Sequence, residues 1–178
     1  MDHLATGIAT AFYTGLIPLV PGLWGAGLGL LLWFLCRKLP LAVYVSVAVG
    51  LFALGVWAAG EAERTLGQPD AKPIVIDETL GIFLTLTGAA RMRYGWLWGS
   101  LIFLALDVAK PFPASWLDAH LSGGLGIMLD DVVVGLYALL ALVLWRRLVT
   151  QRPEPSVHHQ PQARRTPNPT RSAENDAS

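Results

Sequence analysis

Apolar residues along this chain occur in five runs, each bounded by charged residues, glycines or prolines. The runs cover residues 16–36, 41–59, 79–90, 94–109 and 125–145. The second run has about the length of helix that spans the hydrocarbon core of a bilayer. Only helices and closed barrels satisfy their backbone in lipid, and these runs are too continuous for barrel strands. The pattern predicts an all-α fold, a compact membrane-embedded bundle of four or five hydrophobic helical segments.

Prolines and charged residues predict where these helices begin and end. Two prolines in "IPLVPG" favour a turn, so a straight helix is expected from about Trp24 to the pair Arg37-Lys38. Residues 60–73 predict a polar connection, and residues 110–124 predict a loop or surface turn. The run at 79–90 is short for a perpendicular span, so it is expected to be tilted, re-entrant or buried inside the bundle.

The sequence changes character at about residue 150. The segment "QRPEPSVHHQPQARRTPNPTRSAENDAS" is rich in proline and polar residues and has almost no large apolar side chains. Such a segment cannot bury enough surface to offset the entropy lost on ordering. The sequence therefore predicts a helical membrane domain over residues 1–149 and a proline-rich disordered tail over residues 150–178.

Composition supports a membrane protein and argues against several other classes. Only 15% of the residues are charged, against about a quarter in soluble domains. The net charge is zero and the cations form no basic stripe, so no nucleic-acid partner is expected. The single cysteine, Cys36, excludes an internal disulfide and a cysteine-only metal cluster. The start of the chain lacks a positively charged leader, so a cleaved signal peptide is not expected.

Six ionisable residues lie at the borders of the apolar runs: Asp77, Glu78, Asp107, Lys110, Asp130 and Asp131. Acids near a helix N-terminus gain about 0.3–1 kcal/mol from the helix dipole, which would explain four of them, with Asp77 as an N-cap. Asp107 does not fit, because its helix should end before Lys110-Pro111 and leave it near a C-terminus. A pair between Lys110 and Asp107 is an alternative, but it would not explain the other acids.

The expected topology brings these residues together. If every apolar stretch crosses the membrane, one side carries the starts of the first and last stretches and the ends of the second and fourth. Carboxylates beside one lysine and glycine-rich turns suit Mg²⁺, a hard cation that takes oxygen ligands and is shared with substrate phosphate. Lysine binds phosphate as a point charge. The sequence therefore predicts Mg²⁺ as a cofactor and a phosphate-bearing substrate.

Asp130 and Asp131 are adjacent on the last predicted helix. Neighbouring helical residues point about 100° apart. We therefore expect one of them to face the metal and the other to face a partner such as Lys110. The sequence leaves open which of the two faces the metal.

Four sequence blocks resemble the phosphatidylglycerophosphatase A family: "GLIPLVPGLWGAG", "DAKPIVIDETLG", "LDVAKPFP" and "GGLGIMLDDVVVGLYA". The resemblance covers roughly residues 13–145. It implies an all-helical, multi-pass enzyme of the bacterial inner (plasma) membrane. Such an enzyme uses Mg²⁺ to convert phosphatidylglycerophosphate to phosphatidylglycerol and inorganic phosphate in phospholipid biosynthesis. The implied partners are the membrane and an anionic phospholipid substrate, and the oligomeric state stays open.

The resemblance and the pattern of acids together predict the site residues. The expected metal ligands are Asp77, Glu78, Asp107, Asp130 and Asp131. The expected catalytic residues are Asp107, Lys110, Asp130 and Asp131. The expected substrate-binding residues are Pro21, Gly22, Gly25, Asp70 and Lys110. The implied reaction is metal-assisted hydrolysis of a phosphomonoester, either by direct attack of water or through a phospho-aspartate.

Three positions depart from the family pattern. Leu23 and Ala26 stand where the family usually has hydroxyl residues, and Leu104 stands where it usually has an arginine. These changes motivate an alternative, a weakened or inactive relative that binds an anionic lipid. An ion or proton transporter using membrane carboxylates is less favoured, because the acids are expected at helix ends rather than deep within the spans.

The basic residues at helix ends raise a question of sidedness. In the alternating topology they share the face opposite the acids: Arg37, Lys38, Arg91, Arg93, Arg146 and Arg147. The positive-inside rule would place that face in the cytoplasm. The acids would then face outward, although the family resemblance implies a substrate made on the cytoplasmic leaflet. The side of the membrane that the site faces is therefore left open.

Overall fold

The computed structural model describes residues 2–17, 20–67 and 71–150. These residues form helices and no strands, which confirms the predicted all-α bundle. The elements are α1 (Asp2–Ala9), η1 (Thr14–Leu16), α2 (Pro21–Cys36), α3 (Leu41–Leu66), α4 (Ile76–Thr85), η2 (Leu86–Arg91), α5 (Gly95–Ala109), α6 (Ala114–His120) and α7 (Gly123–Thr150). The predicted tail lies outside the described residues, apart from Thr150 at the end of α7.

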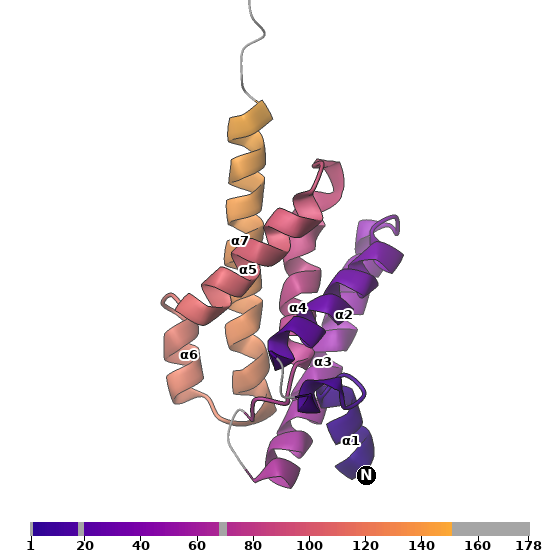
Figure 1. Ribbon diagram of the computed structural model, residues 1–178, viewed down its shortest axis with the longest axis vertical. Coiled ribbons are helices and arrows are strands. Elements are labelled where there is room, and N and C mark those ends of the chain that lie inside the picture. The colour runs from indigo at the N-terminus through magenta and orange to yellow at the C-terminus, as the bar shows by residue number, and fades with distance from the viewer. Residues whose placement is uncertain (1, 18–19, 68–70, 151–178) are drawn as a thin grey trace, which may run out of the picture.

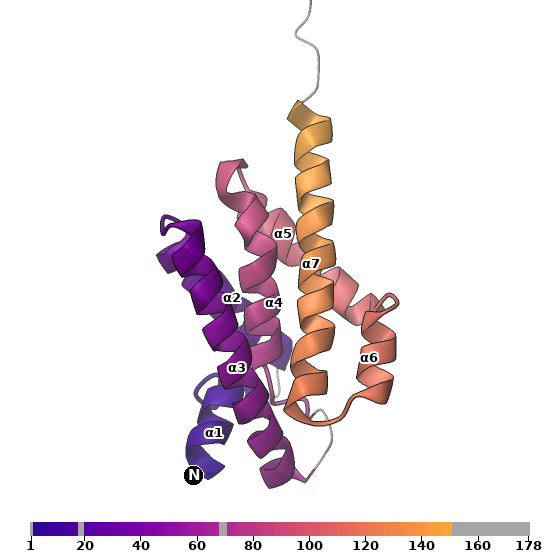
Figure 2. The ribbon, with the colours of Figure 1, turned by 180° about the vertical axis from the view of Figure 1, so that it is seen from behind.

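The long helix α7 contacts most of the other helices of the bundle (Figures 1 and 2). Helix α4 packs between α7 and α2, and α3 packs against both α7 and the N-terminal helix α1. Helix α5 crosses α7 obliquely, and α6 lies beside the first half of α7 (Figure 1). This arrangement brings the start of α4, the start of α2 and the end of α5 around one region of α7.

Within the described part of the chain, two helices are long and apolar enough to cross a membrane, over residues Leu41–Leu66 and Gly123–Leu148. Helices α5 and α6, bent by 50° at the break between them, would make a third span if they cross together. The short run at 79–90 instead forms most of α4 and η2, and the side chains of Leu80, Ile82 and Phe83 are fully buried. Of the three expectations for that run, the structure supports burial inside the bundle.

Glycines allow the helices around α4 to approach closely. A Cβ atom added at Gly25 would lie 2.4 Å from the Val75 carbonyl oxygen, so α2 rests directly on the start of α4. A Cβ atom at Gly135 would lie 2.8 Å from the Gly81 carbonyl oxygen, so α7 rests on the next turns of α4. Small residues at helix interfaces are the usual means by which membrane helices pack tightly. The position of α4 is therefore set from both sides.

The predicted start of one helix and the predicted end of another are wrong. Helix α2 begins at Pro21 rather than near Trp24. Proline suits the first helical position, because its missing N–H would have had no acceptor there. Helix α3 continues through residues 60–66 of the predicted polar connection. An ion pair between Arg64 and Glu61 supports that last stretch, and Gly67 ends it in the left-handed conformation (φ 68°).

The predicted loop over residues 110–124 is also only partly correct. It contains the helix α6, which the proline-rich start of the segment did not indicate. Residues 111–113 form the tight connection, and α6 then packs against α7. This helix contributes a carboxylate to the site, as described below.

Basic residues and acidic residues gather at different heights of the bundle. Arg37 and Lys38 follow α2, Arg93 precedes α5, and Arg146 and Arg147 lie near the end of α7. The end of α2, the start of α5 and the end of α7 all lie in the upper half of the bundle in Figure 1, whereas α2 and α4 begin in its lower half. The predicted separation of the acids from these basic helix ends is therefore present in the structure.

Candidate active site

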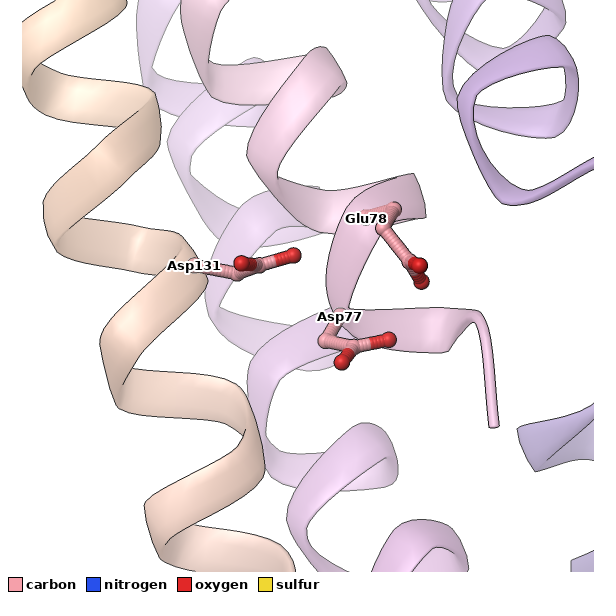
Figure 3. A group of neighbouring side chains, drawn as sticks. All are labelled: Asp77, Glu78 and Asp131. Atoms are coloured by element: carbon pink, nitrogen blue, oxygen red, sulfur yellow. The ribbon is translucent and has the colours of Figure 1, made fainter. Parts of the chain in front are cut away.

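Three carboxylates from two helices meet at the start of α4. Asp77 and Glu78 lie in the first turn of α4, and Asp131 reaches toward them from α7 (Figure 3). Each offers one carboxylate oxygen, and these oxygens lie within 4.8 Å of one another. Asp77 is 9% exposed and Asp131 is 3% exposed. We call Asp77, Glu78 and Asp131 the acidic trio.

The acidic trio contains buried oxygens that the protein leaves without hydrogen bonds. Among the atoms of the described residues, Glu78 Oε2 and Asp131 Oδ2 have no hydrogen-bond partner. The pKa of Glu78 is raised to about 7, mainly because burial removes its carboxylate from water and further because Asp131 lies close by. Buried carboxylates without partners are costly, so a cation would stabilise this arrangement.

The start of α4 explains how two of these acids are held. The Val75 N–H donates to the Ala9 carbonyl oxygen at 2.9 Å, which ties the residue before α4 to the end of α1. Val75 is the N-cap residue and no side chain caps the helix, so the prediction that Asp77 is the N-cap is wrong. Asp77 and Glu78 instead occupy the first turn, where the free N–H groups and the helix dipole favour anions.

Helix-end electrostatics do not explain the acids of α7. This helix begins at Gly123, and its first turn contains no acidic residue. The effect of the dipole falls off beyond the first turn. Asp130 and Asp131 therefore lie too far along α7 to be stabilised by its dipole. Their side-chain contacts with other elements must account for them instead.

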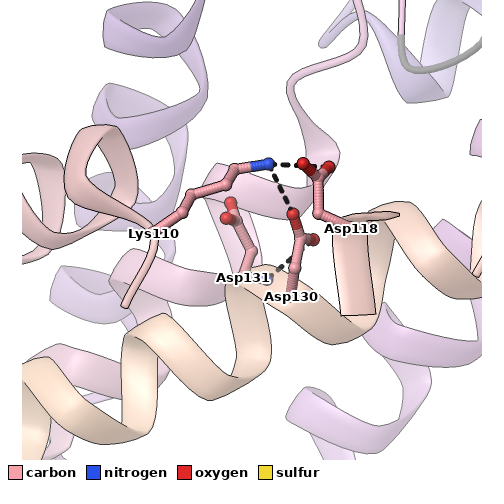
Figure 4. A network of polar contacts seen from close by, with 4 residues as sticks. All are labelled: Lys110, Asp118, Asp130 and Asp131. Carbon is pink, nitrogen blue, oxygen red and sulfur yellow. Dashed lines mark hydrogen bonds and ion pairs between the residues drawn. The ribbon is translucent and has the colours of Figure 1, made fainter. Parts of the chain in front are cut away.

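Asp130 contacts a lysine instead of the acidic trio (Figure 4). Lys110 Nζ donates to Asp130 Oδ2 at 2.7 Å and to Asp118 Oδ1 at 3.0 Å. The second oxygen of Asp130 accepts a hydrogen bond from the Asp131 N–H at 2.9 Å. Asp130 is buried, whereas Asp118 is exposed on α6. We call Lys110, Asp118 and Asp130 the lysine cluster.

The backbone at the end of α5 directs Lys110 into this cluster. Lys110 follows the last residue of α5 and adopts the left-handed conformation (φ 35°), with its N–H donating to the Leu106 carbonyl oxygen at 2.8 Å. The predicted end of this helix before Lys110 is confirmed. The alternative pairing of Lys110 with Asp107 is not found, because the ion pairs of Lys110 are to Asp118 and Asp130.

A pocket of about 800 Å³ lies beside the acidic trio. It is walled by the start of α2, the connection before α4, the end of α5 and α7. The predicted site residues that line it are Pro21, Gly22, Asp77, Glu78, Asp107, Lys110 and Asp131. Asp107 contributes a fourth carboxylate, and its charge acts on Asp131. The convergence expected from the topology is therefore present.

Two predicted site residues are not part of this pocket wall, and a third cannot be placed against it. Asp130 lies behind it in the lysine cluster. Gly25 is buried against α4, and its carbonyl oxygen accepts a hydrogen bond from Thr79 Oγ1 at 3.0 Å. Asp70 lies outside the described residues. Of the residues that depart from the family pattern, Leu23 and Leu104 line the pocket, whereas Ala26 is buried away from it.

The structure adds two residues that the sequence did not single out. Asp118 belongs to the lysine cluster, but it lies in a segment that reads as a loop from its sequence. Lys72 lines the pocket from the connection between α3 and α4. Lys72 lies in the block "DAKPIVIDETLG", whereas no sequence signal indicates Asp118.

Comparison with known proteins agrees with the resemblance of the four blocks. The family model of phosphatidylglycerophosphatase A matches residues 7–146. The chain is 36% identical to phosphatidylglycerophosphatase A of Escherichia coli (strain K12) over 129 residues, which cover 72% of this chain and 75% of the relative. It is 31% identical to the Haemophilus influenzae protein of the same name over 137 residues, covering 76% and 84%.

A further relative carries a different name. A Bacteroides thetaiotaomicron protein named putative phosphatidylinositol-3-phosphatase is 32% identical over 149 residues, which cover 78% of this chain and 92% of that protein. No solved structure matches the chain.

Proposed function

This chain belongs to the phosphatidylglycerophosphatase A family, a family of phosphatases, and on that premise we propose that it hydrolyses the terminal phosphate of phosphatidylglycerophosphate with the help of Mg²⁺. The products are phosphatidylglycerol and inorganic phosphate. The observation that carries the proposal is the acidic trio, which places three carboxylates from two helices within 4.8 Å at the wall of a pocket. Carboxylate oxygens are the ligands that Mg²⁺ prefers, and substrate phosphate commonly completes its coordination.

The residues present fit a magnesium ion. Glu78 Oε2 and Asp131 Oδ2 are buried without hydrogen-bond partners, and a divalent cation would satisfy both. Asp77, Glu78 and Asp131 would hold the ion, and Asp107 borders the same space. When bound there, Mg²⁺ would polarise the phosphoryl oxygens as a Lewis acid and neutralise their charge. We assign Asp131, and not Asp130, to the metal.

The lysine cluster places one positive charge, that of Lys110, beside the acidic trio. Lys110 lines the pocket while Asp130 and Asp118 hold its ammonium. In this proposal Lys110 stabilises the charge that develops on the phosphate. Asp130 acts through Lys110, so it is a positioning residue.

Asp107 is the pocket carboxylate outside both clusters. It lies at the end of α5, where the helix dipole disfavours an anion, so its position has no stabilising explanation in the helix itself. We assign it the role of orienting the attacking water and accepting its proton. Oxygen from that water forms the new bond to phosphorus, the bond from phosphorus to the glycerol oxygen breaks, and the proton taken from the water passes to that glycerol oxygen, which leaves as the alcohol.

The start of α2 provides a further phosphate donor of the proposed site. Pro21, Gly22 and Leu23 line the pocket, but Pro21 has no N–H and the Leu23 N–H donates to the Val20 carbonyl oxygen at 3.0 Å, so the Gly22 N–H is the backbone donor that we assign to the phosphate. Such groups bind phosphate readily. A Cβ atom at Gly22 would lie 2.7 Å from Glu78 Oε1, so glycine keeps this side of the acidic trio open.

One observation favours a second candidate function. Leu23 and Leu104 line the pocket and offer no side-chain hydrogen bond to a phosphate. A relative with weak or no activity that binds an anionic lipid is therefore the alternative. Release of phosphate by the purified protein separates the two.

The assay for the proposed function uses purified protein in mixed micelles of detergent and phosphatidylglycerophosphate. Wild-type protein should release inorganic phosphate with Mg²⁺ and stop when a chelator is added. Phosphatidylinositol 3-phosphate serves as the comparison substrate, in view of the name of the Bacteroides relative. If wild-type protein releases phosphate from neither of the two lipids, the proposal is contradicted. Glu61→Gln, which removes a carboxylate paired with Arg64 on α3, is the control and should retain activity.

The long apolar helices among the described residues are those of a membrane protein. We propose that the chain crosses a bacterial inner membrane more than once. The positive-inside rule would place the end of the bundle with Arg37, Lys38 and Arg93 in the cytoplasm. Replacing Cys36 with serine and introducing a single cysteine at Lys38 gives a clean test. Labelling of that cysteine by a membrane-impermeant maleimide in intact cells would mean that this end lies outside the cytoplasm. That result would contradict the orientation expected from the positive-inside rule.

A further inference from the structure

Two lysines line the pocket, and their surroundings differ. Lys110 Nζ is within hydrogen-bond distance of both Asp130 and Asp118. Lys72 is exposed and forms none of the ion pairs found between described residues. The pocket therefore has one lysine already held by carboxylates and a second whose ammonium contacts none of the acidic trio. Among the described residues, the second lysine is the pocket cation that forms no ion pair, so a ligand would not have to displace a described partner.

The backbone that carries Lys72 is well anchored. The Ile74 N–H donates to the Ala71 carbonyl oxygen at 2.8 Å, which closes a tight turn around Lys72. The Val75 N–H then donates to Ala9 at the end of α1. Gly15 packs against the Pro73 carbonyl oxygen so closely that a Cβ atom there would lie 2.2 Å from it. The exposed side chain of Lys72 therefore extends into the pocket from a fixed turn.

The charges of the pocket call for a cation away from the acidic trio. Its walls carry the carboxylates Asp77, Glu78, Asp107 and Asp131. A phospholipid whose head group ends in a phosphomonoester also carries a phosphodiester, which links the head group to the diacylglycerol. The phosphomonoester belongs at the acidic trio and Lys110 in the proposed reaction. The phosphodiester is a second anion of the same molecule, and the repulsion between it and four carboxylates must be offset elsewhere.

The apolar part of the pocket wall is consistent with a lipid that extends beyond these charges. Val20 and Leu23 from the start of α2 and Val108 from α5 line the pocket and are exposed, Val108 by 87%. Exposed apolar side chains at the mouth of a polar pocket suit the diacylglycerol part of such a ligand. The phosphodiester of the ligand would then lie between this apolar rim and the acidic trio.

We propose that Lys72 binds the phosphodiester of the lipid head group, while the phosphomonoester lies at the acidic trio. The assignment rests on the proposed function for the position of the reacting phosphate. Lys72 is then a substrate-binding residue that favours lipids with two phosphates over simple phosphomonoesters. Its ammonium contributes a charge-assisted hydrogen bond that Leu23 and Leu104, from the other walls, cannot supply.

The test compares wild-type protein with Lys72→Gln, Lys72→Arg and the control Lys38→Gln, which alters an exposed lysine at the opposite end of the bundle. Short-chain dihexanoyl phosphatidylglycerophosphate is the substrate. Dihexanoyl phosphatidylglycerol, which has only the phosphodiester, and inorganic phosphate, which has none, are the inhibitors. Lys72→Gln should raise KM for the substrate and the inhibition constant of phosphatidylglycerol about tenfold each, the loss expected for one charge-assisted hydrogen bond.

The same variant should leave kcat and the inhibition constant of inorganic phosphate unchanged. Lys72→Arg should restore most of the affinity, because it keeps the charge. Equal weakening of both inhibitors by Lys72→Gln would place Lys72 on the reacting phosphate and overturn the assignment. No effect of Lys72→Gln on either inhibitor would also overturn it.

Direct binding separates this inference from the proposed function. Calorimetric titration of detergent-solubilised protein with dihexanoyl phosphatidylglycerol does not depend on catalysis. If wild-type protein hydrolyses no substrate, the proposed function fails. The Lys72 assignment then stands if Lys72→Gln weakens this binding about tenfold and Lys38→Gln does not, and it fails if the two variants bind alike.

Discussion

The acidic trio and the lysine cluster contain adjacent residues of one helix, but they differ in how their charges are satisfied. Asp131 lies among carboxylates and has a buried oxygen with no hydrogen-bond partner. Asp130 has both oxygens occupied, one by Lys110 Nζ and the other by the Asp131 N–H. The lysine cluster is therefore complete within the protein, whereas the acidic trio keeps buried oxygens that a cation would satisfy. In the proposed function, one residue along α7 thus separates a positioning role from a metal-binding role.

The largest effect we expect from this difference is on catalysis. Asp131→Asn should lower phosphate release from phosphatidylglycerophosphate by at least about a hundredfold, since even residues behind metal ligands contribute 10- to 100-fold. Asp130→Asn should cost less, because asparagine can still accept a hydrogen bond from Lys110. Initial rates at saturating Mg²⁺ measure both. A greater loss in Asp130→Asn than in Asp131→Asn would reverse the two roles.

The two variants should also change stability in opposite directions when no metal is present. Asp131→Asn removes a buried charge that has an unsatisfied oxygen beside other carboxylates, so it should raise Tm. Asp130→Asn weakens the partner of Lys110 and should lower the free energy of unfolding by about 1–3 kcal/mol. Thermal unfolding in detergent with a chelator measures both. A lower Tm for Asp131→Asn would mean that this carboxylate is already satisfied by the protein.

Within the lysine cluster, the two ion pairs should differ in strength. A double-mutant cycle on Lys110→Met and Asp130→Asn should give a coupling energy of about 1–3 kcal/mol, because Asp130 is buried. The cycle with Asp118→Asn should give less than about 1 kcal/mol, because Asp118 is exposed. Unfolding free energies of the single and double variants give both values. Equal couplings would mean that α6 shields Asp118 from water more than its exposure indicates.

The glycines of α2 should differ in their effect on packing rather than on the site. Gly25→Ala should destabilise the protein by about 1–3 kcal/mol, because its Cβ would meet the backbone of α4. Gly27→Ala is the matched control, since nothing lies within 4 Å of its Cβ position, and it should not destabilise the protein. Gly22→Ala should change activity more than stability, because its Cβ would meet the mobile end of Glu78. A loss of stability in Gly27→Ala equal to that in Gly25→Ala would contradict the packing of α2 on α4.

The sequence predicted the helical architecture because each apolar run is long and clearly bounded. The end of α5 before Lys110-Pro111 follows from local sterics, and the burial of α4 was among the expectations for a run too short to span. The start of α2 at Pro21 was missed because proline was taken only as a helix breaker. Proline at the first helical position is favourable, and the sequence alone offers both interpretations.

The candidate site was predictable in its residue types and less so in its contacts. The spacing of α7 residues predicted that Asp130 and Asp131 would face different surroundings, and the structure pairs Asp130 with Lys110 and places Asp131 among carboxylates. The contribution of Asp118 could not be predicted, because it depends on how α6 folds back onto α7. Gly25 was predicted from its block as a substrate-binding residue, and the structure adds a contact that the sequence does not indicate, the close packing of α2 on the start of α4.

Calorimetric titration of Mg²⁺ into wild-type, Asp131→Asn and Asp130→Asn protein tests the central claim most directly. The claim is that the acidic trio binds the metal and that Asp130 only positions Lys110. Wild-type protein and Asp130→Asn should bind Mg²⁺ with similar affinity, and Asp131→Asn should show no binding. Mg²⁺ binding by Asp131→Asn with the affinity of wild-type protein would contradict the account.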